Sequence, residues 1–273
     1  MNTTWPYRTM DLFWLGSTAI VYALLEKTSL NLYATHSLLT IFWPGTGLAL
    51  ALLLLGGRKF WPAIFLGALL GGVWSGQAVD MAMTVSLVRT LEVLLGSWLL
   101  TRQHAFDCSL ASLPDLYRLT WLAGTLSTAI GAAAGLCVLL LQGNVALHLA
   151  FIEFVLWWMA DLVGILIMTP LILSWRTPSR LRVMRSLEMG LLLGVAFLVG
   201  QIVFLDWFRE TFTFINRGYW LYPLVCWAAI RFGLFGVQLV MLLTSVQALI
   251  GAALGIGTYG YSLSSAQIFN FWA

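Results

Sequence analysis

Apolar residues form long continuous runs along this chain, and charged residues, prolines and Gly-rich polar clusters separate the runs. The stretch 48–55 is apolar at every position, which is not the alternating pattern of a membrane β-barrel strand. A helix needs about 20 apolar residues to cross the hydrocarbon core of a bilayer. The pattern therefore predicts an all-α polytopic membrane protein, a bundle of nine to ten transmembrane helices. The predicted spans are 12–30, 37–56, 60–75, 78–100, 119–141, 153–175, 188–208, 219–232, 237–256 and the opening of a tenth at 262–273.

The composition agrees with a lipid environment. Of the 273 residues 60% are hydrophobic and 9% are charged, with a mean hydropathy of +0.90, whereas soluble domains carry roughly 25% charged residues. The 14 basic and 11 acidic residues do not form a basic stripe, so we expect no nucleic-acid partner. The three cysteines and three histidines have no metal-ligand spacing, so we predict no metal site and no cofactor.

The basic residues also predict an orientation. When the spans alternate from a cytoplasmic amino terminus, ten of the 14 basic residues lie inside and three outside, while Arg89 lies within a span. Positive charge is enriched on the cytoplasmic side of membrane proteins. We therefore expect a multi-pass membrane protein with a cytoplasmic amino terminus. The tenth span would lead back to the cytoplasm, where an output domain would follow.

One predicted span is interrupted near its start. The sequence Trp43-Pro44-Gly45-Thr46-Gly47 places a proline and two glycines about a third of the way through the span, so we predict a helix broken near Trp43-Pro44. Backbone groups freed at that depth must contact protein, water or a ligand, because lipid cannot satisfy them. A kink packed against neighbouring helices and a ligand-lining segment both satisfy this condition. Trp43, Pro44 and Thr46 are therefore candidate ligand-binding or signalling residues.

Charged residues within the spans are the strongest candidates for function, because lipid-facing charges are costly. Arg89 and Glu92 are three apart and can pair on one helix face. Glu153, Trp157 and Asp161 are spaced by four, which places both carboxylates and an indole on one face. One midplane arginine thus faces two midplane acids, Glu92 and Asp161. The excess carboxyl is available to a proton or to a cationic or hydroxylated ligand.

Each of these features also has a purely structural interpretation. An ion pair between Arg89 and one acid would only hold the helices in register. Glu26 and Glu153 lie nearer the outer surface, where we interpret them mainly as solvated rim groups. Glycine pairs four apart predict close helix packing in four spans. These pairs are Gly67 and Gly71, Gly131 and Gly135, Gly190 and Gly194, and Gly251 and Gly255.

Several short motifs resemble one family. They are WPGTGLA at 43–49, GRKFWP at 57–62, LGA at 66–68, RTLEVLLG at 89–96, WMADLVG at 158–164, TPL at 169–171, WAA at 227–229 and RFG at 231–233. Together they resemble the MASE-one family, the first membrane-associated sensor domain. In proteins of that family the membrane domain precedes a cytoplasmic histidine kinase or a GGDEF diguanylate cyclase, with or without a phosphodiesterase domain. The family's acidic positions in the fourth and sixth spans correspond to Glu92 and Asp161. Where the family usually has Asn-Thr before the first of these acids, this chain has Arg89-Thr90.

We therefore predict one sensory input domain over residues 1–273, without the output domain. The resemblance implies that this domain lies in the bacterial inner (cytoplasmic) membrane. It would detect a ligand or a membrane state and signal to a histidine kinase or diguanylate cyclase. The chain lacks nucleophile-elbow, zinc-protease and phosphate-loop motifs, so we expect no enzymatic activity in it. A small-solute transporter is the alternative, because a broken span and midplane charges suit a translocation path. The expected partners are the lipid bilayer, a small-molecule ligand of unknown identity, the output domain and, in one arrangement, a second copy of the chain.

Overall fold

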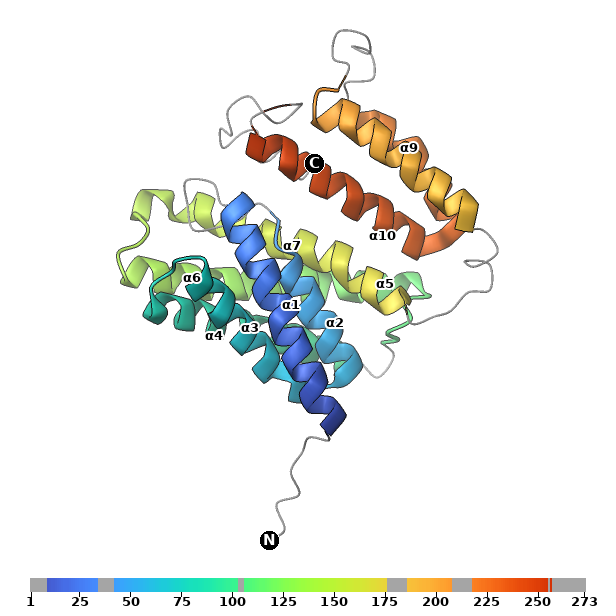
Figure 1. Ribbon diagram of the computed structural model, residues 1–273. Coiled ribbons are helices and arrows are strands. Elements are labelled where there is room, and N and C mark those ends of the chain that lie inside the picture. Colours follow the sequence, from blue (N-terminus) through green and yellow to red (C-terminus); the bar gives the residue numbers. More distant parts are fainter. Residues whose placement is uncertain are drawn as a thin grey trace. The chain divides into compact units, whose positions relative to one another are not determined.

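The computed structural model describes residues 9–33, 42–102, 106–175, 186–207, 218–254 and 256. These ranges contain helices and no strands, which confirms the predicted all-helical class for the described part of the chain (Figure 1). The α-helices are α1 (Thr9–Tyr33), α2 (Pro44–Gly56), α3 (Trp61–Trp74), α4 (Val79–Thr101), α5 (Leu113–Arg118), α6 (Thr128–Leu141), α7 (Ala150–Trp175), α9 (Ser186–Phe204) and α10 (Tyr222–Leu254). Short helical segments of other types are η1 (Arg58–Phe60), η2 (Leu119–Ser127), η3 (Leu147–Leu149) and η4 (Gly218–Leu221).

Fewer helices can cross a membrane than the apolar pattern predicted. Five segments in the described ranges are long and apolar enough, namely Val79–Thr101, Leu113–Leu141, Leu147–Trp175, Ser186–Phe204 and Tyr219–Gly251. The count of nine to ten transmembrane helices is therefore not supported. With 13 and 14 residues, α2 and α3 extend only about 20 Å, against about 30 Å for the hydrocarbon core. The predicted tenth span, 262–273, lies outside the described residues.

The chain divides into two compact units, one up to Thr169 and one from Pro170, with the boundary inside α7. In the first unit, α4 contacts α2, α3, η2 and α6, and α1 packs along α3. A Cβ atom added to Gly67 or Gly71 of α3 would lie within 3 Å of α1 atoms. This glycine pair therefore allows the two helices to approach closely, as predicted.

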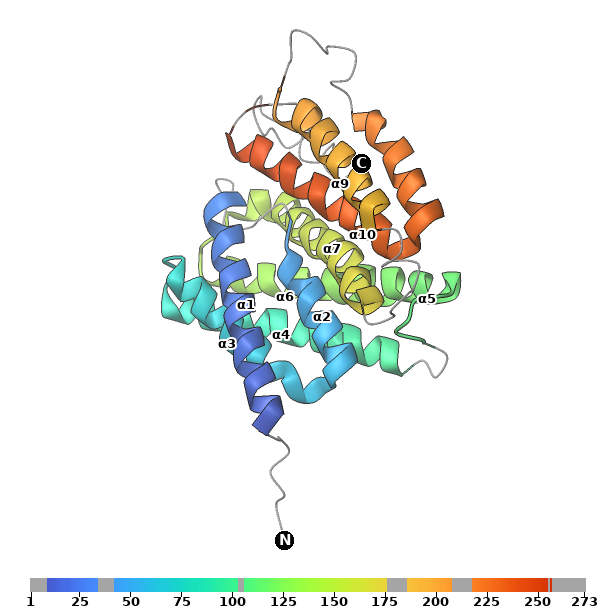
Figure 2. The ribbon, with the colours of Figure 1, turned by 45° about the vertical axis from the view of Figure 1, so that its right-hand side comes forward.

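In the second unit, α9 lies alongside α10 (Figure 2). Their shared core includes Leu192, Ala196 and Val240. The predicted spans 219–232 and 237–256 correspond to the two helices of α10, which meet at a kink at Gly233 (φ 64°, ψ −152°). A Cβ atom at Gly190 or Gly194 would meet nothing within 4 Å, so the close packing predicted for this pair is not seen among the described residues.

The sequence around Pro44 forms the start of a helix. Trp43 is non-helical, with φ −123° and ψ 87°, and α2 begins at Pro44. Proline suits the first turn of a helix because its missing N–H would have no partner there in any case. The structure thus has a helix start where we predicted a break within a span. The first part of that span, residues 37–41, lies outside the described residues.

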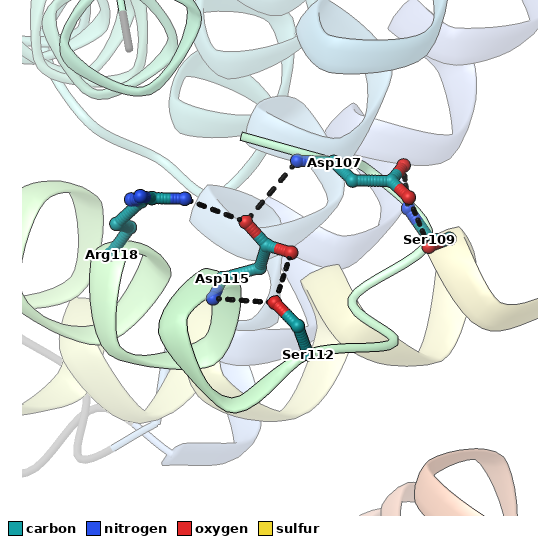
Figure 3. Close-up of polar contacts among 5 residues, drawn as sticks. All are labelled: Asp107, Ser109, Ser112, Asp115 and Arg118. Carbon is teal, nitrogen blue, oxygen red and sulfur yellow. Dashed lines mark hydrogen bonds and ion pairs between the residues drawn. The ribbon is translucent and has the colours of Figure 1, made fainter. Parts of the chain in front are cut away.

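A polar network holds the start of α5 (Figure 3). The Ser112 hydroxyl accepts a hydrogen bond from the Asp115 amide (3.4 Å) and donates one to the Asp115 carboxylate (2.6 Å). The same carboxylate accepts a hydrogen bond from Arg118 at 3.1 Å. The Ser109 hydroxyl and amide donate to Asp107, and these hydrogen bonds lower the pKa of that exposed carboxyl. A side-chain cap of this kind satisfies amides that lack partners at a helix start.

Candidate functional site

The start of α2 lies directly against the middle of α7. The Trp43 amide donates a hydrogen bond to the Ala160 carbonyl (3.2 Å), and the Thr169 hydroxyl donates to the Gly47 carbonyl (2.9 Å). A Cβ atom at Gly164 would lie 1.9 Å from the Trp43 carbonyl oxygen, and one at Gly47 would lie 2.1 Å from the Gly164 carbonyl oxygen. The two segments therefore meet backbone to backbone. This contact leaves no room for side chains and places Thr46 beside Asp161.

A buried ion pair links α4 to α7. Arg89 Nη1 lies 3.4 Å from Asp161 Oδ1, and the Thr46 hydroxyl donates a hydrogen bond to the same oxygen. Arg89 is 5% exposed and Asp161 is completely buried. The arginine thus pairs between helices, although its sequence position also allowed pairing within α4. One carboxylate oxygen joins residues from α2, α4 and α7.

Two indole rings flank the guanidinium group. The Arg89 Cζ atom lies 3.8 Å from the ring centroid of Trp43 and 5.4 Å from that of Trp157. The face of an indole attracts a cation, and the attraction is stronger where water is excluded. These rings therefore provide part of the environment that water would otherwise give to a buried charge.

Three buried carboxyl groups act on this one guanidinium. Glu26, Glu92 and Asp161 all interact electrostatically with Arg89, and each is at most 2% exposed. The interpretation of Glu26 as a solvated rim group was wrong, because α3 packs against this part of α1. The same interpretation was wrong for Glu153, which is also buried, two turns before Asp161 on α7. Glu26, Glu92 and Asp161 alone give three acids around one base. The centre thus has two more acids than bases, and proteins neutralise such buried charge with protons, cations or hydrogen bonds.

Glycines of α6 make room for two of these side chains. A Cβ atom at Gly131 would lie 2.3 Å from Glu92 Oε2, and one at Gly135 would lie 2.2 Å from Trp157 Cη2. Neither Glu92 oxygen has a hydrogen-bond partner within the described part of the chain. The glycine pair that predicted helix-to-helix packing therefore accommodates a carboxyl group from α4 and an indole from α7.

A small cavity lies beside Arg89, with room for about one water molecule. Its polar lining consists of Glu26, Gln77 and Arg89, and the Trp157 ring forms part of its wall. Gln77, Met81, Val85 and Arg89 are spaced by four, so they form one stripe along α4 and the turn before it. The cavity extends from the α3–α4 turn towards the buried ion pair.

The comparison with known families covers almost the whole chain. The MASE1 family model matches residues 14–269. The chain belongs to the MASE1 family. MASE1 is a membrane-associated sensory input domain and is not catalytic, so the predicted resemblance to the MASE-one family is confirmed. Searches of the curated proteins and of the solved structures found no match.

Several residues around the centre of this MASE1 domain were missed by sequence reasoning. Tyr22 is 1% exposed, and its ring and Cβ atom lie where side chains at Gly45 and Gly67 would be. Its spacing of four from Glu26 within an apolar run was the available signal. Gln77 had no such signal, because it lies in a turn between two helices.

The π-helical segment η2 was also not predicted. Its Ser127 hydroxyl donates a hydrogen bond to the Glu92 carbonyl (2.6 Å), and Trp158 Nε1 donates to the Thr125 carbonyl (3.1 Å). A π-helix shifts backbone carbonyls away from their usual partners and is frequent at functional sites. Here it connects the backbone of α4 to a side chain of α7 next to the candidate centre.

Proposed function

We propose that this MASE1 domain senses a ligand or a membrane state at the centre formed by Arg89, Asp161 and Thr46. It would pass a conformational bias to a cytoplasmic output domain of the histidine kinase or diguanylate cyclase type. The observation that carries this proposal is the buried ion pair between α4 and α7, to which Thr46 of α2 is hydrogen-bonded and which is accompanied by surplus acid. Membership of a sensory family supports the input role.

The geometry supports a switch between two packings. Asp161 Oδ1 contacts both Arg89 and Thr46, so a ligand or proton that changes the charge here alters two interhelical contacts together. The start of α2 is held on α7 by the Trp43 and Thr169 hydrogen bonds, so a shift at Thr46 would extend to these backbones. A ligand can bias two states only by its different affinity for each, typically about 1–3 kcal/mol of coupling.

Helix α7 offers a route for the signal. It carries Asp161 in the first unit and continues past Pro170, where the second unit begins. A proline inside a helix removes one backbone hydrogen bond and favours bending at that point. We infer that a displacement of α7 at Asp161 changes the angle of the helix around Pro170.

The test joins the chain to a reporter histidine kinase and compares Asp161→Asn with Asp80→Asn. Asp80 lies on the exposed first turn of α4 and serves as the matched control. Asp161→Asn should change reporter activity by about fivefold or more, as expected for typical coupling energies, while Asp80→Asn should not. Equal activity of the wild-type, Asp161→Asn and Asp80→Asn fusions would contradict a sensory role for the centre.

A small-solute transporter is the second candidate. Buried charges and a helix that starts among them, as α2 does at Pro44, also occur at transporter binding sites. Proteoliposomes containing the purified chain separate the two functions. With ²²Na⁺ as the probe solute, uptake by wild type that is lost in Asp161→Asn would favour transport. Binding of ²²Na⁺ without uptake would favour sensing.

A further inference from the structure

We propose that the cavity beside Arg89 binds one small monovalent cation through the Glu26 carboxylate and the Gln77 side-chain amide oxygen. This assigns a ligand class to the centre described above. It rests on the proposed sensory function only for the effect of the cation on an output domain, because binding itself can be measured on the isolated chain.

The charges around the cavity favour a cation. Arg89 has Asp161 as its ion-pair partner at 3.4 Å, so Glu26 is a second acid on the same guanidinium. Glu26 lines the cavity, is 2% exposed, and its Oε2 atom has no hydrogen-bond partner in the described ranges. A buried carboxylate oxygen without a hydrogen-bond partner is costly, and Glu26 shares the one guanidinium with Asp161 and Glu92. A positive charge in the cavity would remove that cost.

A second oxygen ligand lies in the same cavity wall. Gln77 Oε1 also has no hydrogen-bond partner among the described residues, and Gln77 lines the cavity together with Glu26. Carboxylate and amide oxygens are the ligands that hard cations prefer. The Trp157 ring is a third group in the lining that attracts a cation.

The size and charge of the site favour a monovalent ion. The cavity has room for about one water molecule, which excludes an organic amine. Divalent ions bind through several charged oxygen ligands, and no group of three or more His, Cys, Asp or Glu in the described ranges could hold a metal ion. The guanidinium of Arg89 also lines the cavity and would repel a doubly charged ion more strongly.

Residues of α4 and of the turn before it line the cavity from Gln77 to Arg89. Gln77 is partly exposed in the turn before α4, whereas Arg89 lies three helical turns further along and is buried. Met81 and Val85 line the cavity between them. The lining of this one cavity thus includes both a partly exposed residue, Gln77, and the buried Glu26 carboxyl group.

Binding is tested on the purified full chain in lipid nanodiscs. NaCl replaces choline chloride at constant ionic strength, and Na⁺ binding is followed by isothermal titration calorimetry and ²³Na NMR. We expect saturable binding that Glu26→Gln weakens by about thirtyfold or more, as for the loss of a buried charge partner. Asp80→Asn removes an exposed carboxylate from the first turn of α4 and should leave the affinity unchanged.

Gln77→Ala keeps the proposal testable if Glu26→Gln fails to fold, because Gln77 is partly exposed in a turn. Circular dichroism checks folding, and Na⁺ affinity should fall in this variant as well. Equal Na⁺ affinity in wild type, Glu26→Gln and Gln77→Ala, or no saturable binding to wild type, would overturn the proposal.

A kinase fusion separates the cation site from the proposed sensory function. Output that depends on Asp161 without Na⁺ binding contradicts only the cation site, whereas Na⁺ binding without any change in output contradicts only the sensory function.

Discussion

The carbonyl oxygen of Trp43 occupies the space that a side chain at Gly164 would need. A Cβ atom at position 164 would lie 1.9 Å from that oxygen, closer than any real contact of this kind. The atoms that would clash belong to the backbones of α7 and of residue 43, so no side-chain rotation can relieve the contact. The Trp43 amide also donates a hydrogen bond to the Ala160 carbonyl, which holds this backbone in place. Gly164 thus sets the distance between α2 and α7 one turn after Asp161.

Gly164→Ala should therefore force the start of α2 away from α7 and weaken the contact between Thr46 and Asp161. Overpacking of this kind typically costs about 1–3 kcal/mol, measurable as a lower unfolding midpoint in detergent. Gly190→Ala on α9 is the matched control, because its added Cβ atom would meet nothing within 4 Å. Alanine also favours a helix more than glycine does, so the control should be neutral or slightly stabilising. Similar losses in both variants would argue against the close contact.

The ion pair between Arg89 and Asp161 predicts a non-additive double substitution. Arg89→Met should cost about 3–5 kcal/mol, because it leaves Asp161 without its ion-pair partner, whereas Asp161→Asn should cost less, because Glu26 and Glu92 still act on the guanidinium. The double variant should cost clearly less than the sum, which a double-mutant cycle of unfolding free energies would measure.

Glu188→Gln is the control for this cycle. Its partner is Arg231, whose side chain is 42% exposed, so the loss should stay below about 1 kcal/mol. Strictly additive losses at Arg89 and Asp161 would show that the two side chains do not pair directly.

Sequence reasoning found the central charges because a charge within an apolar run must face away from lipid. Arg89 and Asp161 satisfied that criterion, and they are paired in the structure. Glu26 did not, because its closeness to the end of a span was interpreted as exposure to water. The packing of α3 on α1 that buries Glu26 depends on Gly67 and Gly71, and no property of residue 26 itself reveals it.

The described residues support fewer membrane crossings than the sequence predicted, for a related physical reason. Apolar residues are needed both against lipid and inside a protein core, and a hydropathy pattern does not distinguish the two environments. Eight of the 13 residues of α2 are buried within the protein. Where the structure describes them, the predicted ranges therefore correspond to helices, although α2 and α3 are too short to span the bilayer.

The indole above the guanidinium makes a third prediction. Trp43→Leu removes an aromatic face 3.8 Å from Arg89 Cζ, whereas Trp43→Phe keeps one. The leucine variant should be less stable than the phenylalanine variant by about 1–2 kcal/mol, the range for a desolvated cation–π contact. Trp98 provides the control, since Arg102 lies over its ring at 5.1 Å on the exposed end of α4. If the leucine and phenylalanine variants differ in stability as much at position 98 as at position 43, the cation–π contact does not account for the loss at position 43.

The last prediction concerns Gly131 and the carboxyl group that packs on it. A Cβ atom at position 131 would lie 2.3 Å from Glu92 Oε2 and 2.6 Å from Glu92 Cγ, so Gly131→Ala must displace that side chain. Because Glu92 is buried, the displacement should lower the free energy of unfolding by about 1–3 kcal/mol. Glu92→Ala in the same chain should recover much of this loss, since the added methyl group then occupies vacated space.

The same experiment separates contact from helix propensity. Gly194→Ala, whose added Cβ atom meets nothing within 4 Å, should be insensitive to Glu92→Ala. A loss at Gly131→Ala that is equally large with and without the Glu92 side chain would contradict direct packing. Recovery specific to position 131 would show that the glycine of α6 leaves the space that the Glu92 carboxyl group of α4 occupies, so the two helices can pack closely only while position 131 has no side chain.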